Sequence, residues 1–341
     1  MNDRVLSICM PTYKRRKKLQ KAYSTIVKQI KECCAEEIVE YIISVNPAGD
    51  GTEKRSGYML KKWLSEQDKE KFVSVNINRE NIGADNNIAL VLTKATGKYV
   101  WLVGDDDILL DGSVQKVLRL IQQYPNLAWI YMNYGYEDRQ AKNIEPMYLI
   151  KKIEGYYENG RQAMLSNFKY LDGGILFTTA NIYLREGMDE LIAKGVQGPQ
   201  CTMIYTMYAA TKGGAYIISE PMIDQGQDIL WKDEAYDIVI LNFNNVLLKL
   251  VNNGYEEKEI IGLIRTRMHR EAVSIWFLLL KEFIKDFDKA VKHYMWYLKL
   301  IPWTTLGMTV TLPFWAIYLI IRHKYRTFKR SKQKRALRIA Q

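Results

Sequence analysis

The chain has 341 residues, of which 48% are hydrophobic and 26% are charged, and its formal net charge is +11. This balance excludes an intrinsically disordered chain and is typical of one large domain with additions, or of two domains. Residues 322–338 contain nine Lys or Arg and no acidic residue, so most of the net positive charge of +11 belongs to the C-terminal tail. This argues against a nucleic-acid-binding core and predicts an anionic surface as the partner of the tail.

The sequence shows no secretory leader and no cysteine framework. Only a short apolar strand follows Asp3 and Arg4, without a small-residue cleavage site after it. The chain has four cysteines, without C-x-x-C spacing, at Cys9, Cys33, Cys34 and Cys201. We therefore expect reduced thiols in a cytosolic setting, with neither disulfides nor a zinc site.

The first 112 residues alternate between predicted strands and helices. Strands are expected at residues 4–10, 38–45, 72–77 and 99–103, and helices at residues 19–30, 58–64 and 81–93. This alternation predicts an α/β fold with a mainly parallel sheet. Ligands bind outside the carboxyl ends of the strands in such sheets, so the segments that follow these strands should meet in one crevice.

Two polar segments lie at the first strand ends. Pro11-Thr12-Tyr13 ends the first strand, and a basic cluster at residues 14–18 opens the next helix. Helix N-termini and basic side chains favour phosphate, although a solvated helix end is the simpler interpretation of the cluster taken alone. A loop that begins at Asn46 ends the second strand.

The end of the fourth predicted strand carries Asp105, Asp106 and Asp107 after the apolar run 99–103. Three adjacent carboxylates repel one another, and burying them is costly unless a cation or strong donors compensate. Carboxylate oxygens at a rigid strand end suit Mg²⁺ or Mn²⁺, which also bind substrate phosphates. A solvated acidic turn before a helix is the alternative, and the flanking strand favours the metal site.

The order of these motifs resembles that of the family 2 glycosyltransferases. The chain reads P-T-Y at residues 11–13, N-I-G-A-D-N-N at 81–87, A-T-G-K-Y-V-W-L at 95–102 and G-D-D-D-I-L at 104–109. The resemblance is good over residues 5–112, weak to about residue 235, and greatest to the abequosyltransferase-like branch, which acts on bacterial surface polysaccharides. It implies a GT-A-type, Rossmann-like sheet flanked by helices that binds a nucleotide sugar.

The resemblance also implies roles for residues near the first strand end. Pro11, Thr12 and Tyr13 would line the nucleotide pocket, with Lys14 or Arg15 nearby. Asn46 stands where most members have an Asp that contacts the base. An Asn amide can also bond a base edge, so the contact is expected here in altered form.

The remaining expected contacts are acidic. Asp85 falls in the segment that packs beside the nucleotide, and Asp105 belongs to the same donor-binding set. By the resemblance, Asp106 faces the sugar or ribose and Asp107 is the metal ligand. A Mn²⁺ or Mg²⁺ ion that bridges both phosphates would stabilise the charge on the departing diphosphate.

The general base is not evident from the sequence. The resemblance places an acidic residue before a later helix, but residues 197–200 read Gln-Gly-Pro-Gln ahead of the helix predicted at 201–210. An acceptor hydroxyl needs a carboxylate within hydrogen-bond reach, and Gln cannot accept its proton. Asp172 and Asp189 are the candidates that remain, and both also suit structural roles.

The middle of the chain is expected to form the acceptor-binding half, residues 113–235, beside a nucleotide-sugar-binding half at residues 1–112. Helices are expected at residues 113–124, 160–168 and 185–193, strands at 127–134, 175–184 and 215–219, and a polar loop at 138–150. Gly173 and Gly174 suit either a turn or a close approach of the acceptor. Asp224, Asp228 and Asp233 suit either a further ligand or a hydrated loop.

The C-terminal part is predicted to be a helical extension, residues 236–299, and a membrane-associating segment with a basic tail, residues 300–341. Residues 300–321 carry no formal charge, and about 20 apolar residues suffice for a span. Pro302 and Pro313 interrupt this segment, and a full crossing would separate the tail from the catalytic domain. We expect an in-plane or re-entrant segment on the cytoplasmic face of the inner membrane, with a buried helix as the alternative.

The sequence therefore predicts a metal-dependent, inverting glycosyltransferase at a membrane surface. Its donor would be a nucleoside-diphosphate sugar, and its acceptor a glycan or a lipid-linked glycan. A nucleotidyltransferase would use similar carboxylates, but no Gly-rich loop with Arg and Lys follows the first strand. A non-catalytic glycan-binding protein on a degenerate transferase fold is the other alternative, and Gln200 favours it.

Overall fold

The computed structural model describes residues 4–47, 56–67, 70–138, 143–196, 201–226, 242–270, 286–300 and Gly307. The chain divides into two compact units. Residues 1–232 and 241–263 form the first unit, which contains the sheet, and residues 233–240 and 264–341 form the second. The division expected near residue 235 differs from this one, because residues 241–263 cluster with the sheet.

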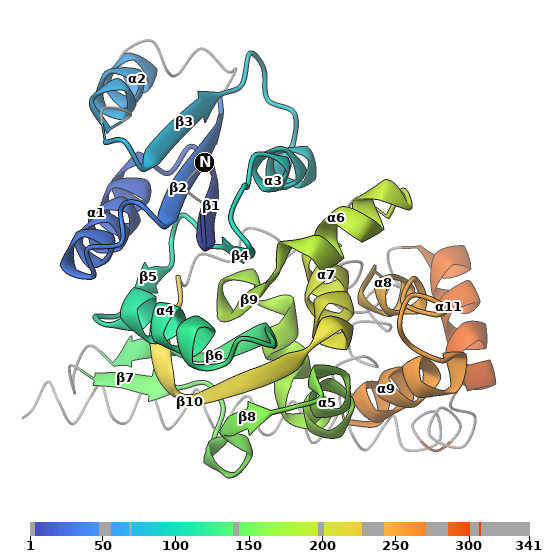
Figure 1. The fold of residues 1–341 in the computed structure, drawn as a ribbon. Helices are drawn as coiled ribbons and strands as arrows, with labels where there is room; N and C mark the ends of the chain where they lie inside the picture. Colours follow the sequence, from blue (N-terminus) through green and yellow to red (C-terminus); the bar gives the residue numbers. More distant parts are fainter. Residues whose placement is uncertain are drawn as a thin grey trace, which may run out of the picture. The chain divides into compact units, whose positions relative to one another are not determined.

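Ten strands within the described ranges form one sheet (Figure 1). They are β1 (Leu6–Tyr13), β2 (Val39–Asn46), β3 (Val73–Ile77), β4 (Tyr99–Leu102), β5 (Ile108–Leu109), β6 (Leu127–Asp138), β7 (Asn143–Pro146), β8 (Gly155–Tyr157), β9 (Asn181–Leu184) and β10 (Gly214–Asp224). The main order is β3-β2-β1-β4-β9-β6-β10-β5, with β7 beside β6 and β8 beside β10.

The first four strands in this order are parallel, as the alternating pattern predicts. Strand β9 runs antiparallel to both of its neighbours, β4 and β6, while β6 and β10 are parallel to each other. The start of β9 therefore lies at the same edge as the ends of β1, β2, β4, β6 and β10. This edge gathers the segments that form the candidate site.

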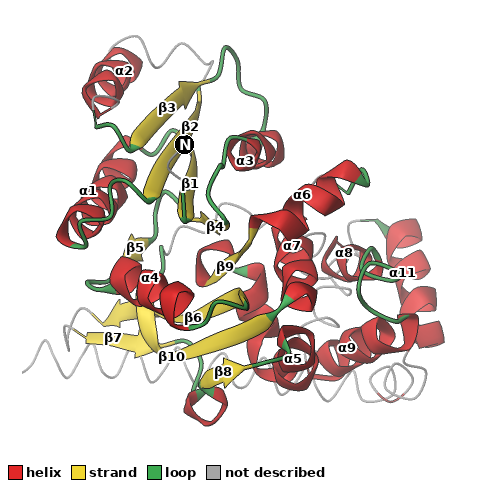
Figure 2. Ribbon diagram, in the orientation of Figure 1, coloured by secondary structure: helices red, strands yellow, loops and turns green. Residues whose placement is uncertain are grey.

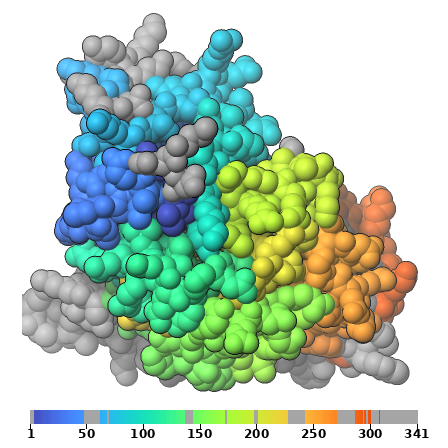
Figure 3. Space-filling model, in the orientation of Figure 1, coloured from blue at the N-terminus to red at the C-terminus, as the bar shows by residue number. Residues whose placement is uncertain are grey.

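The described helices of the first unit lie around this sheet (Figure 2). They are α1 (Arg16–Glu32), α2 (Ser56–Gln67), α3 (Ala84–Thr93), α4 (Ser113–Gln123), α5 (Gly160–Leu176), α6 (Arg185–Ala193), α7 (Cys201–Ala209), α8 (Phe243–Leu248) and the start of α9 (Glu257–Arg270). Of these described helices, α8 lies against α7 and not against a strand. Helices α1 and α3 lie on opposite sides of β1 and β2. In the space-filling view, α1, α4 and α6 lie on the visible face of this unit together with other segments (Figure 3).

The helix α1 shows how the sequence pattern produces this packing. Its buried apolar side chains are Leu19, Ala22, Tyr23, Ile26 and Ile30, which recur every three or four residues. This spacing places them on one stripe of the helix, and the stripe faces the sheet unit's core. The basic residues between them stay at the surface.

The largest departure from the predicted elements is in α5. The helix continues through Gly173 and Gly174 to Leu176, so the strand expected at residues 175–184 is reduced to β9. A Cβ atom at Gly174 would lie 2.2 Å from the hydroxyl oxygen of Tyr131 on β6. The glycine thus allows the helix to approach this tyrosine, and it does not end the helix.

Three short strands were not expected. Strand β7 lies inside the predicted polar loop 138–150 and pairs with the end of β6, so that expectation was wrong. Strands β5 and β8 each pair with β10. Strand β10 itself runs on past Ser219 to Asp224, which therefore ends a strand and does not belong to a loop.

The second unit contains the end of α9 and α11 (Phe287–Leu300). Residues 271–285 of the predicted helical extension, and residues 301–306 and 308–341 of the membrane-associating segment and its tail, lie outside the described residues. None of the described helices combines the length and the apolar character that crossing a membrane requires.

Candidate functional site

The ends of the parallel strands bring the first strand and the triple aspartate together. Cys9 of β1 pairs with Leu102 of β4, so the residues that follow each of them leave the sheet at the same edge. The hydroxyl group of Thr12 donates a hydrogen bond to Oδ2 of Asp105 over 2.6 Å. Both residues are buried, although 92 residues separate them along the chain.

Arg15 bridges two of the three carboxylates. Its Nη1 atom lies 2.8 Å from Oδ1 of Asp105 and 3.0 Å from Oδ1 of Asp106. The Nζ atom of Lys18 lies 3.8 Å from Oδ2 of Asp106. Lys14 has a φ of 56°, so the left-handed turn between β1 and α1 lies directly before Arg15. The basic start of α1 therefore compensates part of the negative charge at this edge.

Asp107 is held by donors from two segments far along the chain. The hydroxyl group of Thr179 donates to its Oδ2 atom over 2.5 Å, and the backbone N–H of Gly226 donates to its Oδ1 atom over 2.9 Å. Thr179 precedes β9 and Gly226 follows β10, and the antiparallel direction of β9 brings both to the same edge. The sequence analysis missed both residues.

Burial dominates the electrostatics of Asp105 and Asp107. It raises the pKa of Asp107 to about 7, although the bonds from Thr179 and Gly226 act in the opposite direction. Burial also raises the pKa of Asp105, against the bonds from Thr12 and Arg15. A buried carboxylate with a raised pKa is stabilised in its charged form by a nearby cation. The site therefore favours a positively charged ligand.

Two glycines leave room for the carboxylates. A Cβ atom at Gly104 would lie 2.6 Å from Oδ2 of Asp107, and one at Gly226 would lie 2.6 Å from Cγ of Asp106. Real Cβ atoms do not approach other heavy atoms so closely. The cluster is thus enclosed by backbone on both sides.

Asn46 has a structural environment. Its side chain is 3% exposed, its Nδ2 atom donates to the carbonyl oxygen of Gly83 over 2.9 Å, and its Oδ1 atom accepts from Asn78 over 2.8 Å. These bonds attach the turn before α3 to the end of β2. The amide is engaged inside the protein, so the structure gives no support to the expected contact with a nucleobase.

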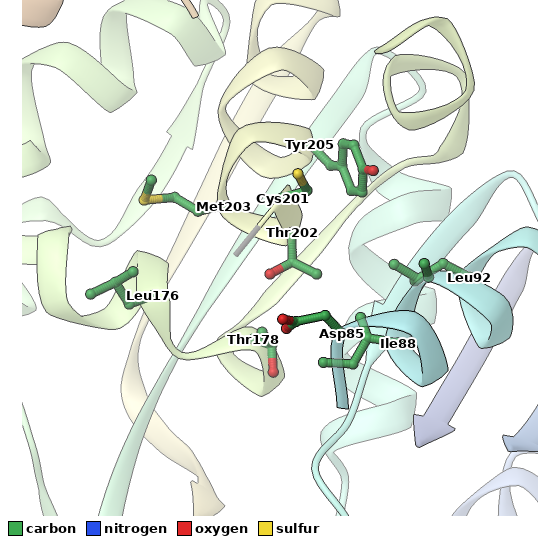
Figure 4. Close-up of a pocket in the computed structure, with 10 residues that line it drawn as sticks. Asp85, Ile88, Leu92, Leu176, Thr178, Cys201, Thr202, Met203 and Tyr205 are labelled. Carbon is green, nitrogen blue, oxygen red and sulfur yellow. The ribbon is translucent and has the colours of Figure 1, made fainter. Parts of the chain in front are cut away.

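Asp85 lies in the first turn of α3 and lines a pocket of about 140 Å³ (Figure 4). The other walls come from residues 176–178 and from the start of α7. Thr178 of this lining is the neighbour of Thr179, which bonds Asp107. Asp85 therefore faces a pocket that is linked to the triple aspartate through Thr178 and Thr179, and its expected place beside the nucleotide stays a prediction.

Of the two predicted candidates for the general base, Asp189 is not brought to this edge. Arg185 binds Asp189 over 2.8 Å and also donates to the carbonyl oxygen of Gly97, which precedes β4. Asp189 thus lies at the end of β4 opposite to the triple aspartate, and its assignment as the base disagrees with this geometry. Asp172 lies within α5, and its side chain is outside the described part of the structure, as are residues 197–200.

The triple aspartate fits a metal ion only in part. Within the described residues, no group of three or more His, Cys, Asp or Glu is arranged to hold a metal ion. Mg²⁺ and Mn²⁺ in nucleotide sites are commonly bound by one or two carboxylates together with water and substrate phosphates. Asp107 and the more exposed Asp106 suit that shared arrangement, in which the substrate supplies the remaining oxygens.

The chain matches the model of the family described as "Glycosyl transferase family 2" over residues 7–192. The chain is a member of glycosyl transferase family 2. The match includes β1, the triple aspartate and β9, and thus most residues of the site described above. The enzyme is also 25% identical to abequosyltransferase RfbV of Salmonella typhimurium (strain LT2) over 266 residues, which cover 74% of this chain and 76% of the relative.

Solved structures agree with this membership at the level of the fold. TarS 1–349 of S. aureus in complex with UDP-GlcNAc is similar with a TM-score of 0.55 and 14% identity, covering 78% of this chain and 72% of that one. Mannosyltransferase PcManGT from Pyrobaculum calidifontis, in complex with GDP-Man and Mn²⁺, has a TM-score of 0.51 and 10% identity over 91% and 81%. This glycosyltransferase has the GT-A fold, as the sequence resemblance implied.

Proposed function

We propose that this glycosyltransferase transfers a sugar from a nucleoside diphosphate to a hydroxyl group of a bacterial surface polysaccharide, with inversion at the anomeric carbon. The observation that carries the proposal is the cluster at the strand ends, in which Asp105 and Asp107 are buried and Asp106 is more exposed, with Thr12 and Arg15 bonded to it. The similarity to an abequosyltransferase supports the polysaccharide as the class of acceptor.

The donor is a nucleoside-diphosphate sugar on this proposal. Arg15 and Lys18 lie at the start of α1, beside the triple aspartate. Basic side chains and the N-terminus of a helix both favour phosphate oxygens. Related folds bind UDP-GlcNAc in TarS and GDP-Man in PcManGT, which supports the donor class without selecting the base or the sugar.

Asp107, with Asp106, would hold a Mn²⁺ or Mg²⁺ ion that is shared with the diphosphate. Such an ion stabilises the negative charge that develops on the leaving diphosphate. The protein's contribution is to hold the carboxylate of Asp107 in place through Thr179 and Gly226. The complex of PcManGT with Mn²⁺ supports this cofactor class.

On this proposal the enzyme meets its acceptor at a membrane surface. We place the enzyme on the cytoplasmic face of the inner membrane, where a lipid-linked glycan would be within its reach. The basis is the sequence of residues 322–338, with nine basic and no acidic side chains, which would bind anionic lipid. A nucleotide-sugar donor is also expected on that face.

A screen of nucleotide sugars tests the proposed function. The full-length protein is incubated with UDP-, GDP-, CDP- and dTDP-sugars and Mn²⁺, and the released nucleotide and phosphate species are measured. We expect a nucleoside diphosphate and a free sugar from one donor class, with the activity lost in EDTA and in Asp107→Ala. Release of pyrophosphate would indicate a nucleotidyltransferase, and release of nothing from any donor would overturn the proposal.

The control variant for this screen is Asp189→Asn, which removes a carboxylate at the opposite end of β4. It should retain the activity of the unmodified enzyme. Full turnover in Asp107→Ala, with its circular dichroism spectrum unchanged, would contradict the metal assignment and leave the transferase proposal in place.

A further inference from the structure

The pocket that Asp85 lines has one polar side and largely apolar walls. Ile88 and Leu92 of α3, Leu176 of α5 and Met203 of α7 supply the apolar surface. Figure 4 shows the carboxylate of Asp85 reaching from α3 toward Thr178 and Thr202. Apolar walls with a few polar groups are typical of sites for small ligands.

Two consecutive residues, Thr178 and Thr179, connect this pocket to the carboxylate cluster. Thr178 lines the pocket, and the next residue, Thr179, donates its hydroxyl hydrogen bond to Asp107. The carbonyl group of Thr179 also accepts a hydrogen bond from Nε1 of the buried Trp101 over 2.8 Å, which fixes the segment against β4. A ligand in the pocket would therefore lie beside a donor held at the triple aspartate.

Asp85 is the group of this lining that can take up a proton. Among the described residues of the pocket, it alone carries a carboxyl group. Burial raises the pKa of the Cys201 thiol and that of Tyr205, so both keep their protons near neutral pH. Tyr205 also donates its hydroxyl proton to the carbonyl oxygen of Val196. Asp85 is exposed, and an acceptor from solution can reach it.

We propose that the pocket binds the acceptor sugar and that Asp85 is the general base of the transfer. This inference rests on the proposed function. The acceptor hydroxyl oxygen forms a bond to the anomeric carbon, while the bond from that carbon to the phosphate oxygen breaks and its electron pair leaves with the nucleoside diphosphate. The hydroxyl proton passes to the carboxylate of Asp85. The base is thus supplied by α3, across the pocket from the start of α7.

The test compares Asp85→Asn with the unmodified full-length enzyme on the donor that the nucleotide-sugar screen identifies. Water serves as the acceptor, so no acceptor glycan has to be known. We expect the hydrolysis rate to fall by about 100-fold or more, the size of a general-base contribution. The affinity for the matching nucleoside diphosphate with Mn²⁺, measured by calorimetry, should stay within about threefold, because the base does not bind the leaving group.

Two further readouts separate a base from a structural residue. The rate of the unmodified enzyme should rise with pH as the base loses its proton, and this limb should be absent in Asp85→Asn. Asp85→Glu, which keeps the carboxyl group, should retain a measurable rate with the same limb. Asp189→Asn is the matched control and should leave both the rate and the pH profile unchanged.

Two outcomes would overturn the inference while the proposed function stands. One is an active enzyme whose Asp85→Asn variant hydrolyses the donor at the unmodified rate. The other is a variant that loses nucleotide affinity as strongly as rate, which would make Asp85 a donor contact. If the unmodified enzyme turns over no nucleotide sugar, the proposed function itself fails, and the two failures are thereby distinguished.

Discussion

Thr179 donates its hydroxyl hydrogen bond to Asp107 over 2.5 Å, and the same hydroxyl oxygen accepts a hydrogen bond from the backbone N–H of Gly104 over 3.0 Å. One side chain thus bonds both the start of the acidic turn and its last carboxylate. Residues 104 and 107 are thereby attached to the segment before β9. This arrangement leads to the first prediction.

Thr179→Val keeps the shape of the side chain and removes both hydrogen bonds. The buried carboxylate of Asp107 and the N–H of Gly104 would each lose a partner. We therefore expect the free energy of unfolding, measured with urea, to fall by about 1–3 kcal/mol. The control is Thr93→Val, an exposed residue whose hydroxyl group bonds within its own helix. Equal stability of the two variants would show that the Thr179 hydroxyl contributes little.

The raised pKa of Asp107 predicts a pH dependence of the metal-free protein. The ordinary pKa of this carboxyl group is 3.8, and burial raises it to about 7 in the folded state. Between these values the folded state holds a proton that the unfolded state has lost, so the contribution of Asp107 to stability falls as the pH rises from 3.8 to about 7 and is lost above that. We expect unmodified protein in EDTA to lose stability relative to Asp107→Asn between pH 5 and pH 8.

This second prediction is checked by urea unfolding of both proteins at the two pH values. A stability difference that is independent of pH would contradict the assigned cause. Adding Mn²⁺ with the nucleoside diphosphate at pH 8 should stabilise the unmodified protein more than Asp107→Asn, because a cation favours the ionised carboxylate.

Asn46→Asp tests whether residue 46 acts through the fold. The substitution replaces the Nδ2 donor to Gly83 with a carboxylate oxygen, which would face a carbonyl oxygen at the start of α3. We expect a loss of about 1–3 kcal/mol in the free energy of unfolding, since a buried acceptor is left without its donor. Asn86→Asp, at an exposed position on the same helix, is the control. If Asn46→Asp bound the nucleotide more tightly and kept the stability of the unmodified protein, the expected contact between residue 46 and the base would be supported instead.

Removal of residues 301–341 tests the membrane proposal. The truncated protein should appear in the supernatant after centrifugation of membranes, because the basic tail and the uncharged segment before it are lost. The unmodified protein should bind vesicles that contain anionic lipid, with binding weakened by salt. A truncated protein that still sediments with membranes would refute this role for the tail.

The sequence analysis was most successful where one rule decides the geometry. Carboxyl ends of parallel strands share an edge, and this rule alone brings Thr12 to Asp105. Thr179 and Gly226 could not be found in this way, because they reach the edge through an antiparallel strand and a long, irregular one. No spacing in the sequence distinguishes Thr179 from the other threonines of the chain.

Two errors have local causes as well. Gly173 and Gly174 are typical of a turn, but the need for space beside Tyr131 explains the glycine at position 174 inside a helix. Asp189 was chosen for its acidity alone, and its ion pair with Arg185 at i and i+4 is a common surface feature of helices. Sequence periodicity identified the elements and did not show which side chains they would turn toward the site.

The four residues of β9 join the two halves of the sheet, since β9 pairs with β4 on one side and with β6 on the other. These four residues therefore set the spacing between the half of the sheet that carries the triple aspartate and the half that begins at β6. Substitutions in β9, at Ile182 for example, should therefore shift the triple aspartate relative to the half of the sheet that begins at β6 without contacting a ligand at the proposed site. We expect variants at these positions to lose catalytic rate while their affinity for ligands stays unchanged.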